Sequence, residues 1–296
     1  MNFDNPAWRN APVRTGLRVA KSLARRRIPL LSRVAVPYDG GRTSINADLH
    51  TPLGLKLYRY GHREPDLDLV GRLLDEGDVF VDGGANVGLF TLVAAARVGP
   101  GGKVVAFEPG RAVRMSLLSN VVLNRLTQVE VVPFALADVP GEARFRVFDA
   151  SGAGLNHLVG STGEGGDIEI VTVTTLDAVL APGDRKRLTF VKLDLEGAEH
   201  AALRGAEQTL REARPDILIE IEASHLSRMG TSPKAVADVL ASHGYRFYRT
   251  GADASGATTL TPAPDLEGPA EHPNVFATVD PARARSRGII VLDSPR

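Results

Sequence analysis

The stretch of sequence that decides the fold reads Val79-Phe80-Val81-Asp82-Gly83-Gly84-Ala85-Asn86-Val87-Gly88. A short apolar run that ends in an acid is typical of a buried parallel strand. The glycines allow a tight turn and a close approach of the backbone to a ligand. Residues 87–98 are apolar on nearly every side and end at Gly99 and Pro100, which predicts a buried helix. Strand, glycine turn and helix in this order predict the opening unit of an α/β sheet.

Strands and helices continue to alternate on both sides of this unit. Further strands are expected at 103–107, 129–133, 189–194 and 216–222, with helices at 65–77, 111–125, 198–213 and 232–244. Residues 245–249 and 274–279 are expected to pair antiparallel. This alternation predicts an α/β fold with a doubly wound, mostly parallel, seven-stranded sheet that helices cover on both faces. Ligands of such sheets bind beyond the carboxyl ends of the strands, where the strand order reverses.

Two additions to the sheet are expected. Residues 43–60 are interpreted as an N-terminal hairpin, because Ile45, Ala47 and Leu49 alternate and Thr51 to Gly54 have the composition of a turn. Residues 142–148 and 168–174 are expected to form a small β insertion around a glycine-rich stretch. The domain boundaries follow: a basic arm over 1–40, one domain over 41–280 with its binding core at 64–225, and a loose C-terminal tail over 281–296.

Composition narrows the function classes. Thirty-five basic residues balance thirty-five acidic ones, so the formal net charge is zero and nucleic acid is not the expected partner. The chain has no cysteine, which excludes disulfides, thiolate metal sites and cysteine nucleophiles and suits a cytoplasmic enzyme. No apolar run approaches the ~18 residues needed to span a bilayer. The basic arm is interpreted as a solvated, partly helical segment; contact with an anionic partner, a membrane surface or a neighbouring subunit is the alternative.

The glycine turn favours a particular kind of ligand. It matches neither the G-x-G-x-x-G pattern of dinucleotide-binding folds nor the G-x-x-x-x-G-K-[ST] phosphate loop. Asp82 at the strand end would repel a phosphate but could accept hydrogen bonds from an ammonium group. Glu108 follows the next strand, where a carboxylate can accept both hydroxyls of a ribose. Together the two acids predict a nucleoside ligand that carries a cationic amino acid.

A second group of charged residues follows the strand at 189–194. It comprises Lys192, Asp194, Glu196 and Glu199. Capping of the next helix explains one of these acids, and the others are interpreted as substrate-handling residues. Asp194 or Glu196 could orient or deprotonate an acceptor hydroxyl. The histidines His157, His200 and His225 are further candidates for the base, and carboxylate spacing alone assigns no metal site.

These motifs resemble those of a known family. Residues 61–65, 81–88, 106–109 and 191–199 are similar to the FkbM family of methyltransferases. The resemblance implies a class I methyltransferase fold, which is Rossmann-like, with S-adenosylmethionine as methyl donor. It implies that the cofactor is bound by Glu64, Asp82, Gly83, Gly84, Asn86, Gly88, Glu108 and Asp194. The residues expected to serve catalysis are Asp194, Glu196, Lys192 and His225, with the general base left open.

The predicted function is S-adenosylmethionine-dependent O-methylation of a hydroxyl on a sugar, a glycan or a polyketide-type natural product. Two alternatives remain: a non-catalytic module that only binds the cofactor, and a methyltransferase acting on nucleic acid or protein. Neutral charge and the lack of an Asn/Asp-Pro-Pro-aromatic motif after the strand at 189–194 disfavour base methylation. No metal is assigned, and homo-oligomerisation is left open.

Overall fold

The computed structural model describes residues 11–28, 31–61, 66–148, 156–159, 167–253, 257–264, 266 and 273–292. Within these residues the main sheet has nine strands in the order β15-β13-β12-β14-β11-β10-β3-β4-β5. In chain order the strands are β3 (Val79–Gly83), β4 (Lys103–Phe107), β5 (Val129–Val132), β10 (Leu188–Leu193), β11 (Asp216–Glu220), β12 (Arg246–Ala252), β13 (Thr258–Pro262), β14 (Asn274–Thr278) and β15 (Ile290–Val291).

The seven strands from β5 to β12 form the predicted sheet. Neighbouring strands from β5 to β11 are parallel, and β14 lies antiparallel between β11 and β12. This arrangement confirms the doubly wound α/β fold, the Rossmann-like fold of class I methyltransferases. The chain places β4 and β5 on one side of β3 and β10 and β11 on the other. The strand order therefore reverses between β3 and β10, which is where this architecture places ligands.

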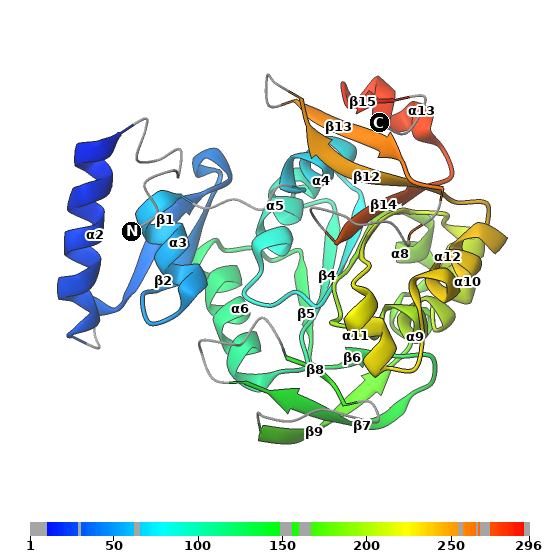
Figure 1. Cartoon of the computed structure of the whole chain (residues 1–296), viewed down its shortest axis with the longest axis horizontal. Helices are drawn as coiled ribbons and strands as arrows, with labels where there is room; N and C mark the ends of the chain where they lie inside the picture. The colour runs from blue at the N-terminus through cyan, green and yellow to red at the C-terminus, as the bar shows by residue number, and fades with distance from the viewer. Residues whose placement is uncertain are drawn as a thin grey trace.

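Helices cover both faces of the sheet (Figure 1). One layer contains α4 (Leu67–Leu73), α5 (Leu89–Val98) and α6 (Arg111–Leu123). The other contains α9 (Glu199–Arg204), α10 (Glu207–Glu212) and α12 (Pro233–Ser242). Successive strand residues pack into hydrophobic cores on opposite faces of the sheet. Phe80 and Phe190 pack with α4 and α5, whereas Val81 and Val191 pack with α9, α10 and α12.

Three short helices complete the second layer and its edges. They are α7 (Leu176–Val179), α8 (Pro182–Lys186) and α11 (Ala223–Arg228). The helix expected over 198–213 is interrupted between α9 and α10. At the break the Gly205 carbonyl oxygen accepts a hydrogen bond from the N–H of Asp177, and the Asp177 carboxylate accepts from the N–H groups of Gln208 and Thr209. Helical periodicity does not reveal these bonds to a distant residue.

The N-terminal hairpin lies earlier in the chain than predicted. Strands β1 (Arg33–Tyr38) and β2 (Thr43–Asp48) pair antiparallel around the short 3-10 helix η2 (Asp39–Gly41), and residues 52–60 form the helix α3 (Pro52–Tyr60). The interpretation of 51–54 as a turn between strands is wrong. The Thr51 hydroxyl caps α3 by accepting a hydrogen bond from the N–H of Gly54 at 2.9 Å, and Pro52 occupies the first turn.

Side chains of α6 hold this hairpin against the main domain. The amide oxygens of Asn120 and Asn124 accept hydrogen bonds from the backbone N–H groups of Asn46 and Ser44, at 2.8 and 2.7 Å. Before the hairpin, α2 (Pro12–Arg26) packs on α3 through buried Val19 and Ser22. In Figure 1 this helix is the dark blue element at the left edge. Among the described residues, no helix combines the length and apolar character that crossing a bilayer requires.

The chain after β12 is more ordered than its composition predicts. Strand β13 lies in a stretch expected to be a loop and pairs antiparallel with β12. The expected loose tail forms the helix α13 (Pro281–Ser286) and strand β15, as far as the structure describes it. Arg283 of α13 pairs with the buried carboxylate of Asp216 at 3.0 Å, which ties this helix to the sheet. Such a long-range pair leaves no local sequence signal.

The predicted β insertion is present as a small second sheet. It comprises β6 (Ala135–Leu136), β7 (Gly141–Val147), β8 (His157–Leu158) and β9 (Asp167–Thr174), in the order β6-β9-β7-β8. Figure 1 shows this sheet at the bottom of the molecule, below α6 and α9. Strands β7 and β9 pair antiparallel over Gly141 to Val147, as the two predicted strands require.

The packing of α3 on β2 can be tested at Gly54. A Cβ there would lie 1.9 Å from the carbonyl oxygen of Asp48, so Gly54→Ala forces the helix away from the strand. We expect this variant to lose about 1–3 kcal/mol of unfolding free energy in urea denaturation. Gly183→Ala in α8 is the matched control, because no atom lies within 4 Å of its Cβ position. The control should be neutral or slightly more stable; equal stability of the two variants would contradict the described packing.

Candidate active site at the reversal of the strand order

A pocket of about 590 Å³ lies at the carboxyl ends of β3, β4, β5 and β10. Its wall combines Gly84 and Asn86 after β3, Glu108 after β4, and Asp194 and Glu196 after β10. The small sheet closes one side with Phe145 and Leu158. The pocket therefore occupies the crevice that the reversal of strand order predicts, and the β insertion forms part of it.

Close backbone contact shapes the floor of the pocket. Gly84 has φ +72°, and a Cβ there would lie 1.9 Å from the carbonyl oxygen of Asp194. The N–H of Asp194 donates to the carbonyl oxygen of Gly83 at 3.1 Å. Asn86 is also left-handed, with φ +51°. The loops after β3 and β10 thus lie in contact, and only glycine fits at position 84.

Glu108 is a buried carboxyl group that borders the pocket. Its two oxygens accept hydrogen bonds from the backbone N–H groups of Asn86 and Gly110, at 3.0 and 2.8 Å. Burial raises the pKa of Glu108 to about 7, although these two N–H groups oppose the shift. The carboxyl group is therefore oriented by the backbone, and it changes charge within the physiological pH range.

Asp82 occupies a different place from the one predicted. Its side chain is fully buried beneath the glycine turn and does not line the pocket, so it is not positioned to meet a ligand's ammonium group directly. It accepts a hydrogen bond from the Thr91 hydroxyl at 2.5 Å and lies 3.7 Å from the Lys192 Nζ. Burial raises the pKa of Asp82 above its usual range. Asp82 therefore acts on the pocket through its neighbours.

Lys192 connects the two loops that form the floor. Its Nζ donates to the carbonyl oxygen of Gly84 at 3.0 Å and lies 3.2 Å from an Asp194 oxygen. The ammonium group also lies over the ring of Phe90, 5.3 Å from its centroid. Burial works to lower the pKa of Lys192, but the charges of Asp194 and Asp82 outweigh it and raise the pKa. Lys192 lies below the pocket wall and orients Asp194.

The three acids after β10 have different roles. Asp194 borders the pocket, with 40% of its side chain exposed. Glu199, the first residue of α9, is the capping acid of the preceding loop, not of the helix: its carboxylate accepts hydrogen bonds from the N–H groups of Leu195 at 2.7 Å and Gly197 at 3.0 Å. Glu196 borders the pocket and has a left-handed backbone, with φ +55°. The structure therefore separates one structural acid from two that face the pocket.

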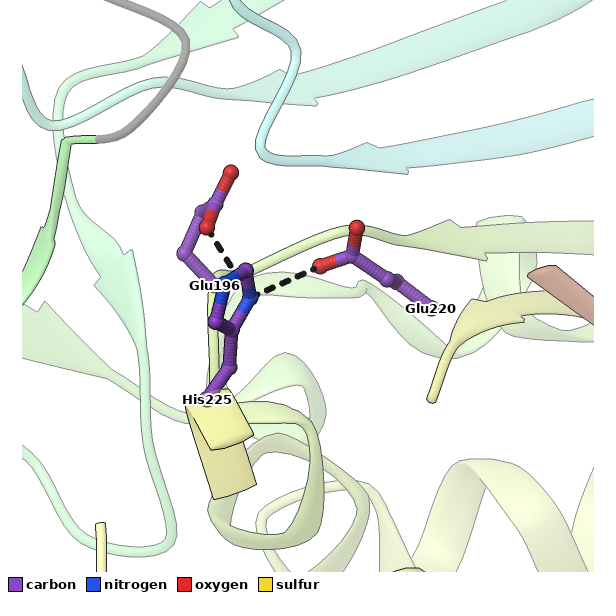
Figure 2. A group of neighbouring side chains, drawn as sticks. All are labelled: Glu196, Glu220 and His225. Atoms are coloured by element: carbon purple, nitrogen blue, oxygen red, sulfur yellow. Dashed lines mark ion pairs between the residues drawn. The ribbon is translucent and has the colours of Figure 1, made fainter. Parts of the chain in front are cut away.

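Glu196 forms a cluster with two residues from the next strand and helix (Figure 2). The Nδ1 atom of His225, on α11, lies 3.0 Å from Glu196 Oε2 and 3.5 Å from Glu220 Oε2. Burial, followed by the charge of Asp194, raises the pKa of Glu196 to about 8 and that of Glu220 to about 9. Burial lowers the pKa of His225. Sequence reasoning did not select Glu220, although a carboxylate at a strand end in this fold is the signal that could have identified it.

The remaining predicted residues lie elsewhere. His157 is buried in β8 with its ring 5.9 Å from that of Phe148, and His200 lies on α9; neither lines the pocket. Gly83 ends β3 and Gly88 is the N-cap of α5, and neither lines the pocket. Glu64 lies outside the described residues.

A family comparison agrees with this geometry. The model of the family described as "Methyltransferase FkbM domain" matches residues 82–247, more than half of the chain. The chain belongs to the FkbM methyltransferase family. The matched region includes the glycine turn, Glu108 and the Asp194–Glu196 loop.

Individual proteins that resemble this chain are more distant. AMB antimetabolite synthetase AmbE of Pseudomonas aeruginosa is 27% identical over 66% of this chain, which spans only 11% of that protein. The solved FkbM methyltransferase of Methylobacillus flagellatus is 17% identical, with a TM-score of 0.38 over 76% of this chain and 52% of that one. A solved S-adenosylmethionine-dependent O-methyltransferase of Thermotoga maritima is 15% identical, with a TM-score of 0.38 over 72% and 64%.

The separate roles of Glu199 and Glu196 can be tested by stability. Glu199→Ala removes the acceptor of two buried N–H groups, so we expect a loss on the order of 2 kcal/mol of unfolding free energy at pH 8. Glu196→Ala removes an acid that lies among other carboxylates, so it should not lower stability by a comparable amount. Urea denaturation of both variants measures the difference. Equal losses would contradict the assignment of Glu199 as the capping acid.

Proposed function

We propose that this FkbM-family protein transfers the methyl group of S-adenosylmethionine to a hydroxyl oxygen. The observation that carries the proposal is the pocket itself, which combines an oriented, buried Glu108 with two acids, Asp194 and Glu196, at the reversal of strand order. The acceptor class, a sugar, glycan or polyketide-type hydroxyl, is supported by the family resemblance and by the neutral charge of the chain.

The residues of the pocket suit both ends of this cofactor. Glu108 offers carboxyl lone pairs to the ribose hydroxyls while two backbone N–H groups hold it in place. Asp194 is part-exposed to the pocket, and its carboxylate attracts the positively charged methionine end of the cofactor. When bound, S-adenosylmethionine supplies a methyl group to the acceptor oxygen, and the carbon–sulfur electron pair remains on sulfur.

The protein's own contribution is alignment and removal of a proton. Alignment of an acceptor with a bound donor can supply much of the rate. Lys192 holds Asp194 through their 3.2 Å ion pair and holds the glycine turn through Gly84, so the two sides of the pocket keep a constant separation. The acceptor hydroxyl loses its proton during transfer. Asp194 and Glu196 border the pocket and can accept this proton, and His225 contacts Glu196.

The raised pKa of Glu108 predicts that cofactor affinity depends on pH. The charged carboxylate is the better acceptor for two ribose hydroxyls, and with a pKa of about 7 its charged fraction rises about tenfold from pH 6 to pH 8. Affinity for S-adenosylhomocysteine should therefore rise by up to about tenfold over this range. Glu108→Gln should bind at least about tenfold more weakly at pH 8 and show a flat profile. Calorimetry at several pH values measures both; a wild-type profile that matches the variant's would contradict the ribose role.

The transfer itself is tested with methyl-labelled S-adenosylmethionine. Purified protein is incubated with hydroxylated glycosides and macrolides, and with RNA, DNA and protein in parallel. Label on a hydroxyl oxygen, lost in Asp194→Asn, supports the proposal. Transfer only to nucleic acid or protein would overturn the acceptor class, and cofactor binding without transfer to any acceptor class would favour a non-catalytic module.

A further inference from the structure

Three polar side-chain atoms meet at the ends of β10 and β11 at ion-pair distance but without a hydrogen bond between them. Glu196 Oε2, Glu220 Oε2 and His225 Nδ1 are buried, and within the described part of the chain they have no hydrogen-bond partner. Buried polar atoms are normally paired, so a group of three that face one another needs an explanation. Figure 2 shows the imidazole lying between the two carboxylates.

The distances from His225 Nδ1 to the two carboxylate oxygens match the coordination shell of a metal ion. The imidazole nitrogen is 3.0 and 3.5 Å from the two carboxylate oxygens, and all three atoms lie within 4.8 Å of one another. Donor atoms that each lie about 2.1 Å from a cation are about 3.0 Å apart in octahedral and about 3.4 Å apart in tetrahedral coordination. The three atoms can therefore bind one cation after only small side-chain movements.

The backbone holds these ligands in place independently of any ion. Gly197 has φ +114°, and a Cβ there would lie 2.5 Å from the carbonyl oxygen of His225, so the loop after β10 touches the start of α11. Glu199 fixes that loop through the N–H of Gly197. Glu222 caps α11 by accepting a hydrogen bond from the N–H of Ser224 at 3.3 Å. Glu196 comes from a loop, Glu220 from the end of β11 and His225 from α11, and the backbone contact between the loop and α11 gives part of the preorganisation a metal site requires.

We propose that Glu196, Glu220 and His225 bind a divalent first-row cation, Mn²⁺ or Zn²⁺, at the edge of the pocket. Carboxylates are the ligands that Mn²⁺ prefers, and imidazole suits Zn²⁺ and other first-row transition metals better than Ca²⁺ or Mg²⁺. Three protein ligands leave at least one coordination position for a water or a substrate oxygen, as in catalytic zinc sites.

The electrostatics of the site favour a cation. The charge of Asp194 raises the pKa of Glu196, Glu199 and Glu220, and Glu199 raises the pKa of Glu196 and Glu220; Lys192 and Arg228 are the cations that oppose this effect. A bound divalent ion would relieve this repulsion between buried carboxylates. The alternative interpretation is a protonated His225 between two carboxylates, and the experiment below distinguishes the two.

The role of the cation rests on the proposed function, whereas its binding does not. Glu196 also borders the pocket, so the cation would stand beside Asp194 and within reach of an acceptor hydroxyl. A divalent cation lowers the pKa of a hydroxyl that coordinates it. The proton would pass to Asp194, and the oxygen would then form its bond to the methyl carbon while the departing sulfur keeps the bonding pair.

Metal binding is measured on the full, untagged chain after treatment with EDTA and removal of the chelator. Mn²⁺ is titrated by following the electron paramagnetic resonance signal of the free ion, and Zn²⁺ by calorimetry, both without cofactor. We expect one equivalent of at least one ion to bind with micromolar affinity. Glu220→Gln and His225→Gln should each weaken this binding at least about tenfold. In pulsed electron paramagnetic resonance, bound Mn²⁺ should also show modulation from the imidazole nitrogen of His225, and this modulation should be lost in His225→Gln.

Two control variants distinguish metal binding at this cluster from nonspecific binding to other acidic side chains. Asp238→Asn changes an exposed acid on α12, outside the cluster. Glu207→Gln changes an exposed carboxylate that lies 3.2 Å from His243. This pair has a spacing similar to that of Glu196 and His225 but lies outside the cluster. Both controls should bind the ion as the wild type does. Melting temperatures of all variants show whether a loss of binding reflects a loss of fold.

The outcomes distinguish this proposal from the proposed function. No saturable binding of Mn²⁺ or Zn²⁺ below about 1 mM, or stoichiometric binding that Glu220→Gln and His225→Gln leave unchanged, would overturn the metal site and favour the protonated imidazole. S-adenosylhomocysteine binding is measured separately on the same metal-free protein. Cofactor binding without metal binding would overturn only the metal site. Metal binding without cofactor binding would overturn only the proposed methyltransferase function.

Discussion

The loops that follow β3 and β10 approach each other so closely that one methyl group would not fit between them. A Cβ on Gly84 would lie 1.9 Å from the carbonyl oxygen of Asp194. Because β3 and β10 are neighbours on opposite sides of the reversal in strand order, this contact brings together residues about 110 positions apart. Asn86, Glu108 and Asp194 reach one pocket for this reason, and the Lys192 ammonium group strengthens the contact by bonding to Gly84.

The contact between the loops after β3 and β10 also brings charged side chains close together. The buried Lys192 pairs with the buried Asp82 and the part-exposed Asp194. Two further acids, Glu196 and Glu220, lie nearby. Burial of ionised carboxyl groups is costly and raises the pKa values of Glu108, Glu196 and Glu220, and nearby acids add to the shift at Glu196 and Glu220. A nucleoside with an ammonium group on one side, and a divalent cation on the other, would each offset part of it. The unfavourable electrostatics of the ligand-free chain are thus consistent with two different cationic ligands.

Local sequence patterns predicted most of the fold and the floor of the pocket. Strand β3 and its glycine turn are continuous in sequence, and Glu108 directly follows β4, so their periodicity and residue types are visible without tertiary contacts. The errors arise where distant segments decide the conformation. Thr51 and Pro52 begin a helix that packs on β2, Asp177 bonds to the break between α9 and α10, and Arg283 orders the tail by reaching Asp216. Asp82 was correctly placed at a strand end, but its burial beneath the turn and the approach of Glu220 to His225 depend on packing alone.

The central claim is that the pocket between the loops after β3 and β10 binds S-adenosylmethionine. Calorimetry of the purified chain with S-adenosylmethionine, S-adenosylhomocysteine and NAD tests it most directly. The account predicts micromolar binding of the first two ligands and none of NAD, because the turn after β3 lacks a pyrophosphate site and acids line the pocket. Failure of a folded sample to bind either sulfur-containing nucleoside would contradict it.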